Sequence, residues 1–386
     1  MMLMKNCIVR RTIPRVFHRG YKVLSIETSC DDTCIALMER SSDKVELIQH
    51  IKSTLDSTEF GGIVPTKAFN HHQTNLARIT KELLENNNLT ISNPPDVICV
   101  TRGPGMAGSL GVGIEFAKGL SVVYGKPFVG VHHMLGHLLV PRFESSGKLP
   151  QFPFLNLLVS GGHTMLVLSK DLLNHEILCN TVDIAAGDAL DKCAREIGIK
   201  GNNLGKELEI FVNAKPEDWN YRNFDMPKPL YNKRGRMFMP AYSFAPFHGA
   251  VQRLVEKENL NLEDEVIKRC VGHHIQKAIF GHMIDKLTLV LENNKEKLKD
   301  VRDFVASGGV ASNITLRNML DKGLESTSIE RTTYPNPSLC TDNAVMIGWA
   351  GIELYESGLT TELSIFPTPK WPLSDLLNVP YWIKKE

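Results

Sequence analysis

Residues 21–39 read YKVLSIETSCDDTCIALME, in which two apolar runs flank the polar residues 29–32. Two strand-like runs around a short polar turn predict a β-hairpin. The same pattern returns in residues 154–169, FLNLLVSGGHTMLVLS, around a turn at 161–163. A unit that recurs roughly 130 residues later predicts a duplicated architecture, in which one hairpin opens each half of the chain.

Helical and strand-like segments alternate along the rest of the chain. The alternation predicts an α/β fold whose strands are mostly buried. Strands are expected at residues 96–101, 127–131 and 301–307, and helices at residues 67–86, 109–124, 133–143, 185–198, 263–293, 312–323 and 343–356. Residues 144–153 contain serine, glycine and proline and are the best candidate for a linker between two lobes. Residues 213–247 are irregular and rich in proline, aromatic and basic residues, so we expect an insertion there.

The composition excludes several classes of protein. Hydrophobic residues make up 42% and charged residues 23% of the 386 residues, as in ordinary globular proteins. A run of 18 apolar residues, which a transmembrane helix requires, does not occur. The formal charge of +1 does not indicate a globally basic nucleic-acid-binding protein. The eight cysteines include no Cys-x-x-Cys pair, which argues against a disulfide framework or zinc ribbon and fits a reducing compartment.

The N-terminus is strongly basic. The first acidic residue is Glu27, and the basic residues before it are Lys5, Arg10, Arg11, Arg15, Arg19 and Lys22. An arginine-rich, acid-free, amphipathic start is typical of a mitochondrial transit peptide, here predicted as residues 1–21; a disordered basic tail is the alternative. Without residues 1–22, 38 basic and 43 acidic residues would remain, a net charge of about −5. A nucleic acid would then have to bind to a local patch.

Residues 132–137, HHMLGH, form a dense histidine cluster. On a helix His133 and His137 face the same side, so their imidazoles can share one metal ion. The alternative is one structural and one exposed histidine. A zinc peptidase needs His-Glu-x-x-His with the glutamate as general base, and Met134 takes that position here.

A third metal ligand is available in Asp342, within residues 340–343 (CTDN), at the start of a predicted helix. An aspartate at this position also suits an N-cap, which contributes ~1 kcal/mol to helix stability without any metal. The spacing alone does not decide between these two roles.

Three glycine-rich turns follow predicted strands. Residues 103–108 (GPGMAG) fit G-x-G-x-x-G, but no acidic residue ends the next strand to bind a ribose, so a dinucleotide-binding fold is rejected. A P-loop motif does not occur. Residues 160–163 (SGGH) suit a hairpin turn. Residues 307–313 (SGGVASN) precede a helix whose N-terminus would favour an anion such as phosphate, a Ser or Asn cap being the alternative.

Carboxylates in or near these turns can hold a metal ion or act as bases, although acids in surface turns are the commoner case. The candidates are Glu27, Asp31, Asp32, Asp188 and Asp191. Residues 221–238 interleave five basic with four aromatic side chains, which can bind phosphates and stack on bases. A solvated loop with buried aromatic residues is the alternative for that segment.

Together these motifs resemble the tRNA N6-adenosine threonylcarbamoyltransferase family, also labelled O-sialoglycoprotein endopeptidase. The matching residues, in the family's order, are 27–33 (ETSCDDT), 61–65 (GGIVP) with His72, 103–110 (GPGMAGSL), Lys118-Gly119, 133–137 (HMLGH), 158–163 (LVSGGH), 185–191 (AAGDALD), 308–313 (GGVASN) and 340–343 (CTDN). The resemblance extends over residues 22–375, and motifs this numerous are highly specific. The basic N-terminus is similar to that of a mitochondrial member.

The resemblance implies a two-lobed α/β fold that is actin-like and sugar-kinase-like, with duplicated ribonuclease-H-like lobes. The repeated hairpins agree with this. The first lobe would comprise residues 22–148, completed by residues 343–386, and the second residues 149–342 with the insertion at 213–247. The resemblance also implies a homodimer in the mitochondrial matrix, which needs only a separate enzyme to make its donor and has no membrane partner.

The implied reaction transfers a threonylcarbamoyl group from threonylcarbamoyl-AMP to N6 of the adenosine next to the anticodon, in mitochondrial tRNAs that read codons beginning with A. By the family's pattern His133, His137 and Asp342 bind one divalent metal ion (zinc, iron or magnesium). The resemblance implies nucleotide binding by Leu158, Val159, Ser160, Gly161, Gly162, Asp191, Gly205 and Asn313. The catalytic candidates are Glu27, Asp31 and Asp32, of which Asp31 or Asp32 would orient the donor or accept a proton.

The sequence departs from the family's pattern at two places. Asn202-Asn203-Leu204-Gly205 replaces a Gly-Gly-Pro element, so the glycine role is assigned to Gly205. Ala245-Pro-Phe-His248 follows Ser243-Phe244 where the family has Ser-Gly-Leu-Lys, so a lysine is missing. Three other functions compete: a metal-dependent peptidase, against which Met134 argues, an ATP-dependent phosphotransferase of the same fold, and a non-catalytic tRNA-binding or scaffold protein.

Overall fold

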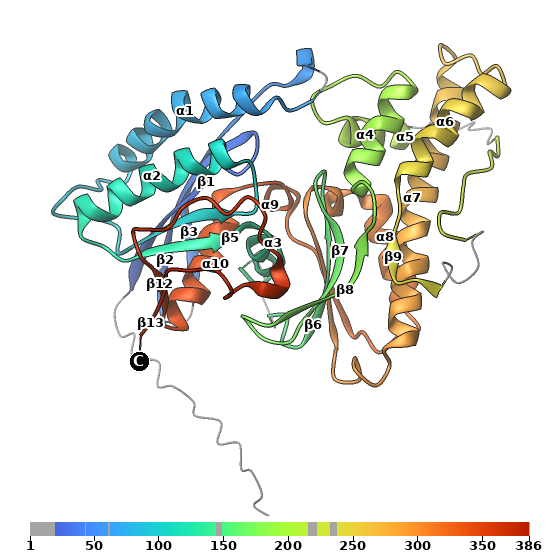
Figure 1. The fold of residues 1–386 in the computed structure, drawn as a ribbon. Coiled ribbons are helices and arrows are strands. Elements are labelled where there is room, and N and C mark those ends of the chain that lie inside the picture. The colour runs from blue at the N-terminus through green and yellow to red at the C-terminus, as the bar shows by residue number, and fades with distance from the viewer. Residues whose placement is uncertain are drawn as a thin grey trace, which may run out of the picture.

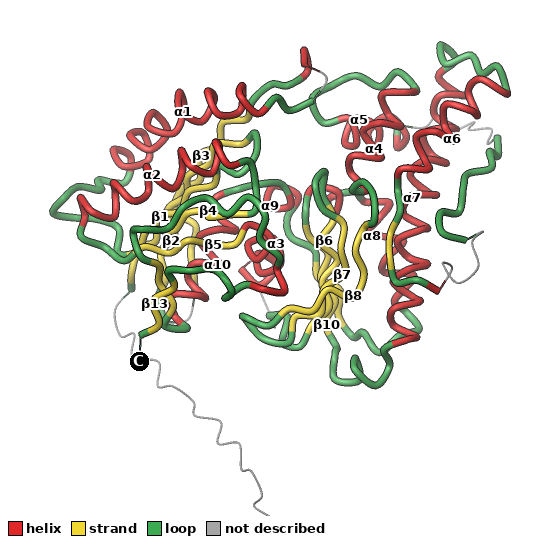
Figure 2. Tube along the Cα trace, viewed as in Figure 1, coloured by secondary structure: helices red, strands yellow, loops and turns green. Residues whose placement is uncertain are grey.

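The structure is a computed structural model that describes residues 20–42, 44–60, 62–143, 149–214, 222–231 and 238–385. Nearly all of the predicted transit peptide (1–21) and residues 144–148 of the predicted linker lie outside the described residues. Figure 1 shows two lobes side by side, and Figure 2 shows that each contains a β-sheet flanked by helices. This arrangement confirms the predicted two-lobed α/β fold.

The first sheet has the strand order β3-β2-β1-β4-β5. Its strands are β1 (Tyr21–Glu27), β2 (Asp32–Arg40), β3 (Val45–Thr54), β4 (Val97–Gly103) and β5 (Phe128–His132). The strands β1, β2 and β3 pair antiparallel, whereas β4 runs parallel to β1 and to β5. The predicted first hairpin is therefore β1–β2, and it lies at the centre of the sheet.

The second sheet repeats this topology with the order β11-β10-β6-β7-β8-β9. Its strands are β6 (Phe154–Val159), β7 (Thr164–Ser169), β8 (His175–Thr181), β9 (Ala241–Tyr242), β10 (Asp303–Ser307) and β11 (Arg331–Thr333). The second hairpin, β6–β7, pairs antiparallel, and β10 lies parallel to β6 as β4 does to β1. The matched order and directions of five strands confirm the duplication, to which β9 is an addition.

Helices cover both faces of the first sheet because alternate residues of its strands face opposite sides. Leu24 and Ile26 of β1 pack into the cluster formed with α1 (Pro65–Asn86) and α2 (Ala107–Tyr124). Val23 packs into the cluster formed with α3 (His133–Phe143) and α10 (Ala344–Glu356). A side chain at Gly351 of α10 would collide with Cys99 of β4, so glycine lets this helix lie close to the sheet.

The second lobe has its own core, formed with five helices. They are α4 (Ala186–Glu196), α5 (Leu204–Asn213), α6 (Ala245–Lys257), α7 (Glu265–Asn293) and α8 (Ile314–Leu324). Residues 213–247 were predicted to lie outside the core, but Tyr242 and Phe244 are fully buried and β9 extends the sheet. The end of this segment therefore belongs to the lobe, while residues 215–221 and 232–237 lie outside the described residues.

The chain returns to the first lobe after the short helix α9 (Pro337–Cys340). Residues 359–385, which we call the C-terminal strap, contain β12 (Leu359–Thr361) and β13 (Trp382–Lys384), which pair antiparallel. Thr361 Oγ1 accepts a hydrogen bond from Gly130 N at 3.0 Å and donates one to Phe128 O at 3.1 Å. The strap thereby satisfies backbone groups at the outer edge of β5.

The two lobes are also joined by a pair of hydrogen bonds between a loop of the second lobe and the segment after β3. Asn202 Oδ1, in the loop between α4 and α5, accepts hydrogen bonds from Ser57 N at 3.1 Å and Ser57 Oγ at 3.0 Å. Figure 1 shows the segment after β3 reaching the second lobe at this place. Within the described ranges, no helix is long and apolar enough to cross a membrane, and no disulfide joins the seven cysteines.

The substitution Thr361→Val tests the role of the strap in stability. It keeps the shape of the side chain but leaves Gly130 N and Phe128 O without their partner, which is expected to lower the free energy of unfolding by about 1–3 kcal/mol. Urea denaturation measures this change. Thr360→Val is the matched control, since no side-chain hydrogen bond is seen for Thr360 among the described residues. Equal stability of the two variants would contradict the assignment.

Candidate metal centre and nucleotide site

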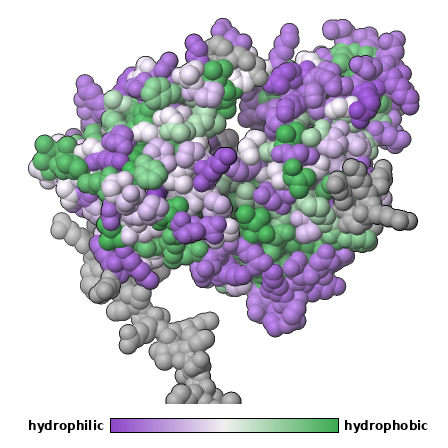
Figure 3. Space-filling model, in the orientation of Figure 1, coloured by the Kyte–Doolittle hydropathy of each residue, from purple (hydrophilic) through white to green (hydrophobic). Residues whose placement is uncertain are grey.

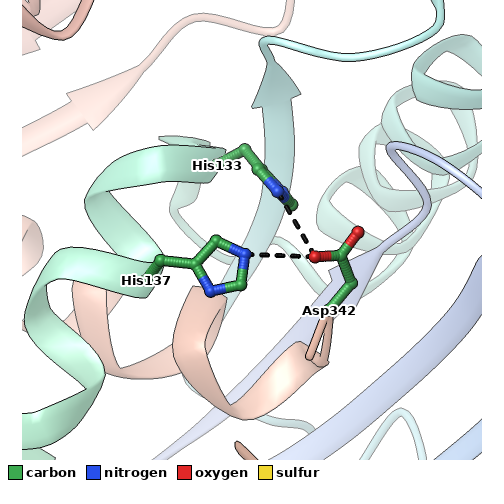
Figure 4. Close-up of side chains that lie close together, drawn as sticks. All are labelled: His133, His137 and Asp342. Carbon is green, nitrogen blue, oxygen red and sulfur yellow. Dashed lines mark hydrogen bonds and ion pairs between the residues drawn. The ribbon is translucent and has the colours of Figure 1, made fainter. Parts of the chain in front are cut away.

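Three side chains converge where α3 begins and α10 is about to begin (Figure 4). Asp342 Oδ1 lies 3.1 Å from His137 Nε2 and 3.5 Å from His133 Nε2. One ligand atom from each of the three residues lies within 4.8 Å of the others. Both histidines are almost fully buried, at 6% and 1% exposure. Two imidazole nitrogens and one carboxylate oxygen form a donor set that fits zinc or iron.

The electrostatics of this cluster suit a cation. Burial alone would raise the pKa of Asp342, but His133, His137 and Lys52 outweigh it and hold the pKa well below its usual range. For His133, burial is outweighed by Asp342 and Glu27, which raise its pKa to about 9. The N-cap alternative for Asp342 is wrong, because Asn343 caps α10 by accepting a hydrogen bond from Met346 N at 2.8 Å. The carboxylate of Asp342 is thereby left to the two histidines.

Glu27, at the end of β1, lies behind His133. Its Oε2 is 3.4 Å from His133 Nδ1 and accepts a hydrogen bond from Thr101, while Oε1 accepts one from Ser29 N at 2.6 Å. The side chain is fully buried. This burial argues against direct contact of Glu27 with a substrate, and it places the carboxylate behind the His133 imidazole.

The hairpin turn brings Asp31 and Asp32 to this side of the lobe in different environments. Asp32 pairs with Lys52 at 2.6 Å and accepts a hydrogen bond from Thr54 at 2.5 Å, and burial raises its pKa to about 6. The pKa of Asp31 is raised by burial and by Asp342. Asp31 is therefore electrostatically coupled to the centre, whereas Asp32 is engaged with Lys52.

His72 of α1 fixes the shape of the hairpin turn. Its Nδ1 is 2.8 Å from Thr33 Oγ1, and its Nε2 is 2.9 Å from Cys30 O. Because the Cys30 carbonyl only accepts, Nε2 carries the proton and Nδ1 accepts from the threonine hydroxyl. Asp31 and Asp32 lie between these two anchored residues.

The turn of the second hairpin lies near the candidate metal centre. Burial, together with the nearby imidazoles of His133 and His137, lowers the pKa of His163 to about 4. Sequence reasoning did not select His163, although it follows directly on Ser160, Gly161 and Gly162. Its position directly after a pair of glycines at the end of a strand is the sequence feature that could have marked His163 as a site residue.

The predicted nucleotide residues gather where parallel strands of the second lobe end. Leu158 and Val159 are fully buried in β6, so only their backbone can face a ligand. Gly161 and Gly162 are exposed, with open space around them. Gly308, after β10, has φ +95°, and a Cβ there would collide with Val159 O. The turn at Gly308 therefore touches the backbone at the end of β6, directly before the turn at residues 160–163.

Asp191 and Gly205 are brought together, since Asp191 Oδ1 accepts a hydrogen bond from Gly205 N at 2.7 Å. Asn313 caps α8 and accepts from Thr315 N at 2.9 Å, so the cap alternative is correct for Asn313. Asp188 instead forms an ion pair with Lys192 at the surface, 2.8 Å apart. The middle of α5 is linked to the N-terminus of α8, because Glu209 of α5 accepts a hydrogen bond from Ile314 N at 2.7 Å.

The basic and aromatic segment, residues 221–238, contains both buried and exposed aromatic side chains among its described residues. Phe224 is buried against α7, and Arg222 forms an ion pair with Glu258 at 3.1 Å. Tyr231 and Phe238 are 55% and 62% exposed beside a cavity of about 650 Å³ along α7. Three of the five basic residues of the segment lie outside the described residues.

The fold and site define a duplicated, two-lobed α/β protein with a His-His-Asp centre near glycine-rich turns. The profile of the family TsaD, tRNA N6-adenosine threonylcarbamoyltransferase, matches residues 46–349, and the chain belongs to this family. The mitochondrial tRNA N6-adenosine threonylcarbamoyltransferase of Schizosaccharomyces pombe is 38% identical over 96% of this chain and 90% of its own. The enzyme of that name from Thermosipho africanus is 37% identical over 90% of this chain and 98% of its own.

Among solved structures, the chain is similar to HypF of T. kodakarensis. The TM-score is 0.51 with 14% sequence identity, over 87% of this chain and 48% of the other. A likeness at this identity supports the fold alone. Family membership, together with Met134 in place of a general base, favours a transferase over the peptidase and phosphotransferase alternatives.

Replacing Gly308 tests its close contact with the end of β6, directly before the turn at residues 160–163. Alanine at φ +95° is strained by about 1–3 kcal/mol, and its Cβ would push the turn away from Val159. We expect Gly308→Ala to lower the melting temperature and to weaken AMP binding at least tenfold, measured by calorimetry.

Gly309→Ala is the matched control for Gly308→Ala. A Cβ at Gly309 would lie 3.7 Å from Thr341, an ordinary contact, so wild-type affinity is expected. Wild-type AMP affinity in Gly308→Ala would show that the turn takes no part in nucleotide binding.

Proposed function

We propose that this chain transfers the threonylcarbamoyl group of threonylcarbamoyl-AMP to N6 of the adenosine next to the anticodon, in mitochondrial tRNAs that read codons beginning with A. The observation that carries the proposal is the placement of His133, His137 and Asp342 beside the turn at residues 160–163. One lobe supplies side chains that suit a metal ion, and the other supplies backbone that suits a nucleotide. Family membership supports the same reaction.

The proposed metal ligands are His133, His137 and Asp342. A nitrogen-rich donor set favours zinc or iron over magnesium, which prefers oxygen ligands. When bound, the ion would supply a Lewis acid for the carbamoyl oxygen of the donor. Ser29 Oγ at 3.1 Å and Glu27 Oε2 at 3.4 Å both lie at His133 Nδ1, and an Nδ1–H shared between them turns Nε2 toward the centre, which would orient the ligand before any ion arrives.

The remaining steps fall to the chain's own groups. The adenine amine is a weak nucleophile, but the mixed anhydride of the donor is already activated. Attack of the adenine amine on the carbamoyl carbon forms the N–C bond, and AMP leaves with the electrons of the broken C–O bond. Asp31 is proposed as the acceptor of the amine proton, because its raised pKa makes it a stronger base than an exposed aspartate. Gly161, Gly162 and Gly308 would admit the AMP phosphate close to backbone.

The mitochondrial assignment rests on the N-terminus. Residues 1–22 hold six basic residues and no acidic one, and the S. pombe relative is named mitochondrial. We place cleavage near residue 21, because β1 begins at Tyr21 and continues into the core. The matrix is proposed as the compartment.

Reconstitution of the reaction tests the proposal. Residues 22–386 loaded with Zn²⁺ or Fe²⁺, unmodified tRNA for a codon beginning with A, and threonylcarbamoyl-AMP are combined, and nucleosides are analysed by mass spectrometry. Wild-type protein is expected to form threonylcarbamoyladenosine. His137→Ala and Asp342→Asn are expected to reduce the rate at least a hundredfold, because each removes one of three ligands.

His175→Ala is the matched control for the ligand variants. His175 is buried like His137 but bonds to Ser169 and Leu172 O in the second lobe, and it is not one of the three candidate ligands. Failure of folded, metal-loaded wild type to make product, even with mitochondrial extract added, would reject the reaction. Full activity of Asp342→Asn would reject the metal's role.

A homodimer is proposed to form through α1 and α2. A groove of about 540 Å³ lies between these helices, and Val122 and Val123 of α2 are 63% and 61% exposed. Figure 3 shows apolar side chains at the end of the molecule where both helices finish. Lys81 and Glu85 stand at the groove, so a two-fold copy can pair them with opposite charges.

Light scattering of residues 22–386 is expected to give the mass of a dimer. Val123→Glu places a charge in the apolar surface and is expected to yield monomers. Val182→Glu, at a 56% exposed valine of the second lobe, is the control and should remain dimeric. A dimer that survives Val123→Glu would place the interface elsewhere.

A further inference from the structure

The first histidine of the cluster, His132, makes different contacts from its neighbours. It is the last residue of β5 and is fully buried. Its Nδ1 accepts hydrogen bonds from Met134 N at 3.1 Å and Leu135 N at 3.4 Å. These are two of the first N–H groups of α3, which have no partner within the helix, so His132 acts as the N-cap of the helix that carries His133 and His137.

The other ring nitrogen of His132 faces the C-terminal strap. Nε2 lies 2.9 Å from the carbonyl oxygen of Trp371, and the two rings are 4.6 Å apart. A carbonyl only accepts, so Nε2 carries the proton and Nδ1 keeps a lone pair for the helix. One tautomer satisfies both sets of contacts, and burial, which lowers the pKa of His132 to about 3, keeps the ring neutral.

The strap that holds Trp371 is itself fixed to the first lobe on both sides of this residue. Thr368 N donates to Arg102 O at 2.9 Å, and Arg102 donates to Pro380 O at 2.9 Å. Trp371 is 4% exposed, and its Nε1 is 3.4 Å from Asp375 O. Trp371 O is therefore a fixed point outside the sheet and the helix.

We propose that His132 is a positioning residue, whose hydrogen bond to Trp371 O of the C-terminal strap fixes the residue directly before α3 and so sets the metal affinity of His133 and His137. The proposal rests on the metal site of the proposed function. His133 is the first residue of α3, directly after His132, so any displacement of His132 moves the adjacent imidazole. The strap thus takes part in the metal site without contributing a ligand.

Two near-isosteric variants separate the contacts of His132. The amide of His132→Asn occupies the place of Nδ1, so it can cap α3 but does not reach Trp371 O. The amide of His132→Gln reaches the place of Nε2, so it can donate to Trp371 O but does not cap the helix. Zn²⁺ affinity is measured by competition with a chelator on residues 22–386, and the free energy of unfolding of the metal-free protein is measured in parallel.

His132→Asn is expected to bind Zn²⁺ about 10–100-fold more weakly than wild type, the usual effect of losing a contact that orients a ligand. His132→Gln is expected to stay within about threefold of wild type, although it loses the cap. Asp264→Ala is the control, since Asp264 caps α7 in the second lobe and accepts from Val266 N at 2.9 Å. It should lower stability without changing Zn²⁺ affinity.

Wild-type affinity in His132→Asn, or equal losses in His132→Asn and His132→Gln, would overturn the proposal, because the strap would then have no separate effect. A change in affinity that follows the change in stability in every variant, Asp264→Ala included, would overturn it as well. These outcomes differ from failure of the proposed function, which would appear as a wild-type protein that binds no Zn²⁺ or forms no product. Weaker Zn²⁺ binding in His132→Asn alone supports the proposal.

Discussion

Two carboxylates, the fully buried Glu27 and the half-buried Asp342, face the imidazole of His133 from opposite sides. Glu27 lies 3.4 Å from Nδ1 and Asp342 lies 3.5 Å from Nε2. Holding two negative charges close together in a largely buried place lowers the stability of the fold unless cationic or hydrogen-bonding groups compensate them. Removing one of those groups leaves an uncompensated charge. The end of β1, the start of α3 and the segment before α10 must therefore stay in fixed relation. The hydrophobic core shared by β1, α3 and α10 holds these three elements together.

The second lobe meets this charged centre with glycine-rich turns. The turn at residues 160–163, the turn at Gly308 and the start of α5 present backbone, while His163 is kept neutral by its low pKa. Side chains that suit a cation, opposite glycine-rich turns, fit the proposed donor, which carries both a polarisable carbonyl and a phosphate. The two lobes differ at equivalent positions of the duplicated fold. The hairpin turn carries Asp31 and Asp32 in the first lobe, and Gly161 and Gly162 in the second.

Much of this arrangement was predictable from the sequence. The two hairpins, the helical spacing of His133 and His137, and the alternation of elements follow from local pattern and gave the fold. The burial of Glu27 was not predictable, since a carboxylate at a strand end usually reaches solvent. The cap by Asn343 rather than Asp342 depends on one residue of helix boundary, which local sequence seldom resolves. The core position of Tyr242 and Phe244 was hidden by the irregular sequence before them.

The first lobe is discontinuous in sequence, and this limits the order in which the lobes can be completed. The sheet from β1 to β5 is finished by residue 132, but one of its faces is covered by α10 and its outer edge by the C-terminal strap. The second lobe, from β6 to β11, needs no residue beyond 333 for its sheet. During synthesis, which proceeds from the N-terminus, the second lobe can therefore finish its sheet before α10 and the C-terminal strap cover the sheet of the first lobe. The apolar face of the first sheet stays exposed until α10 and the C-terminal strap have been synthesised.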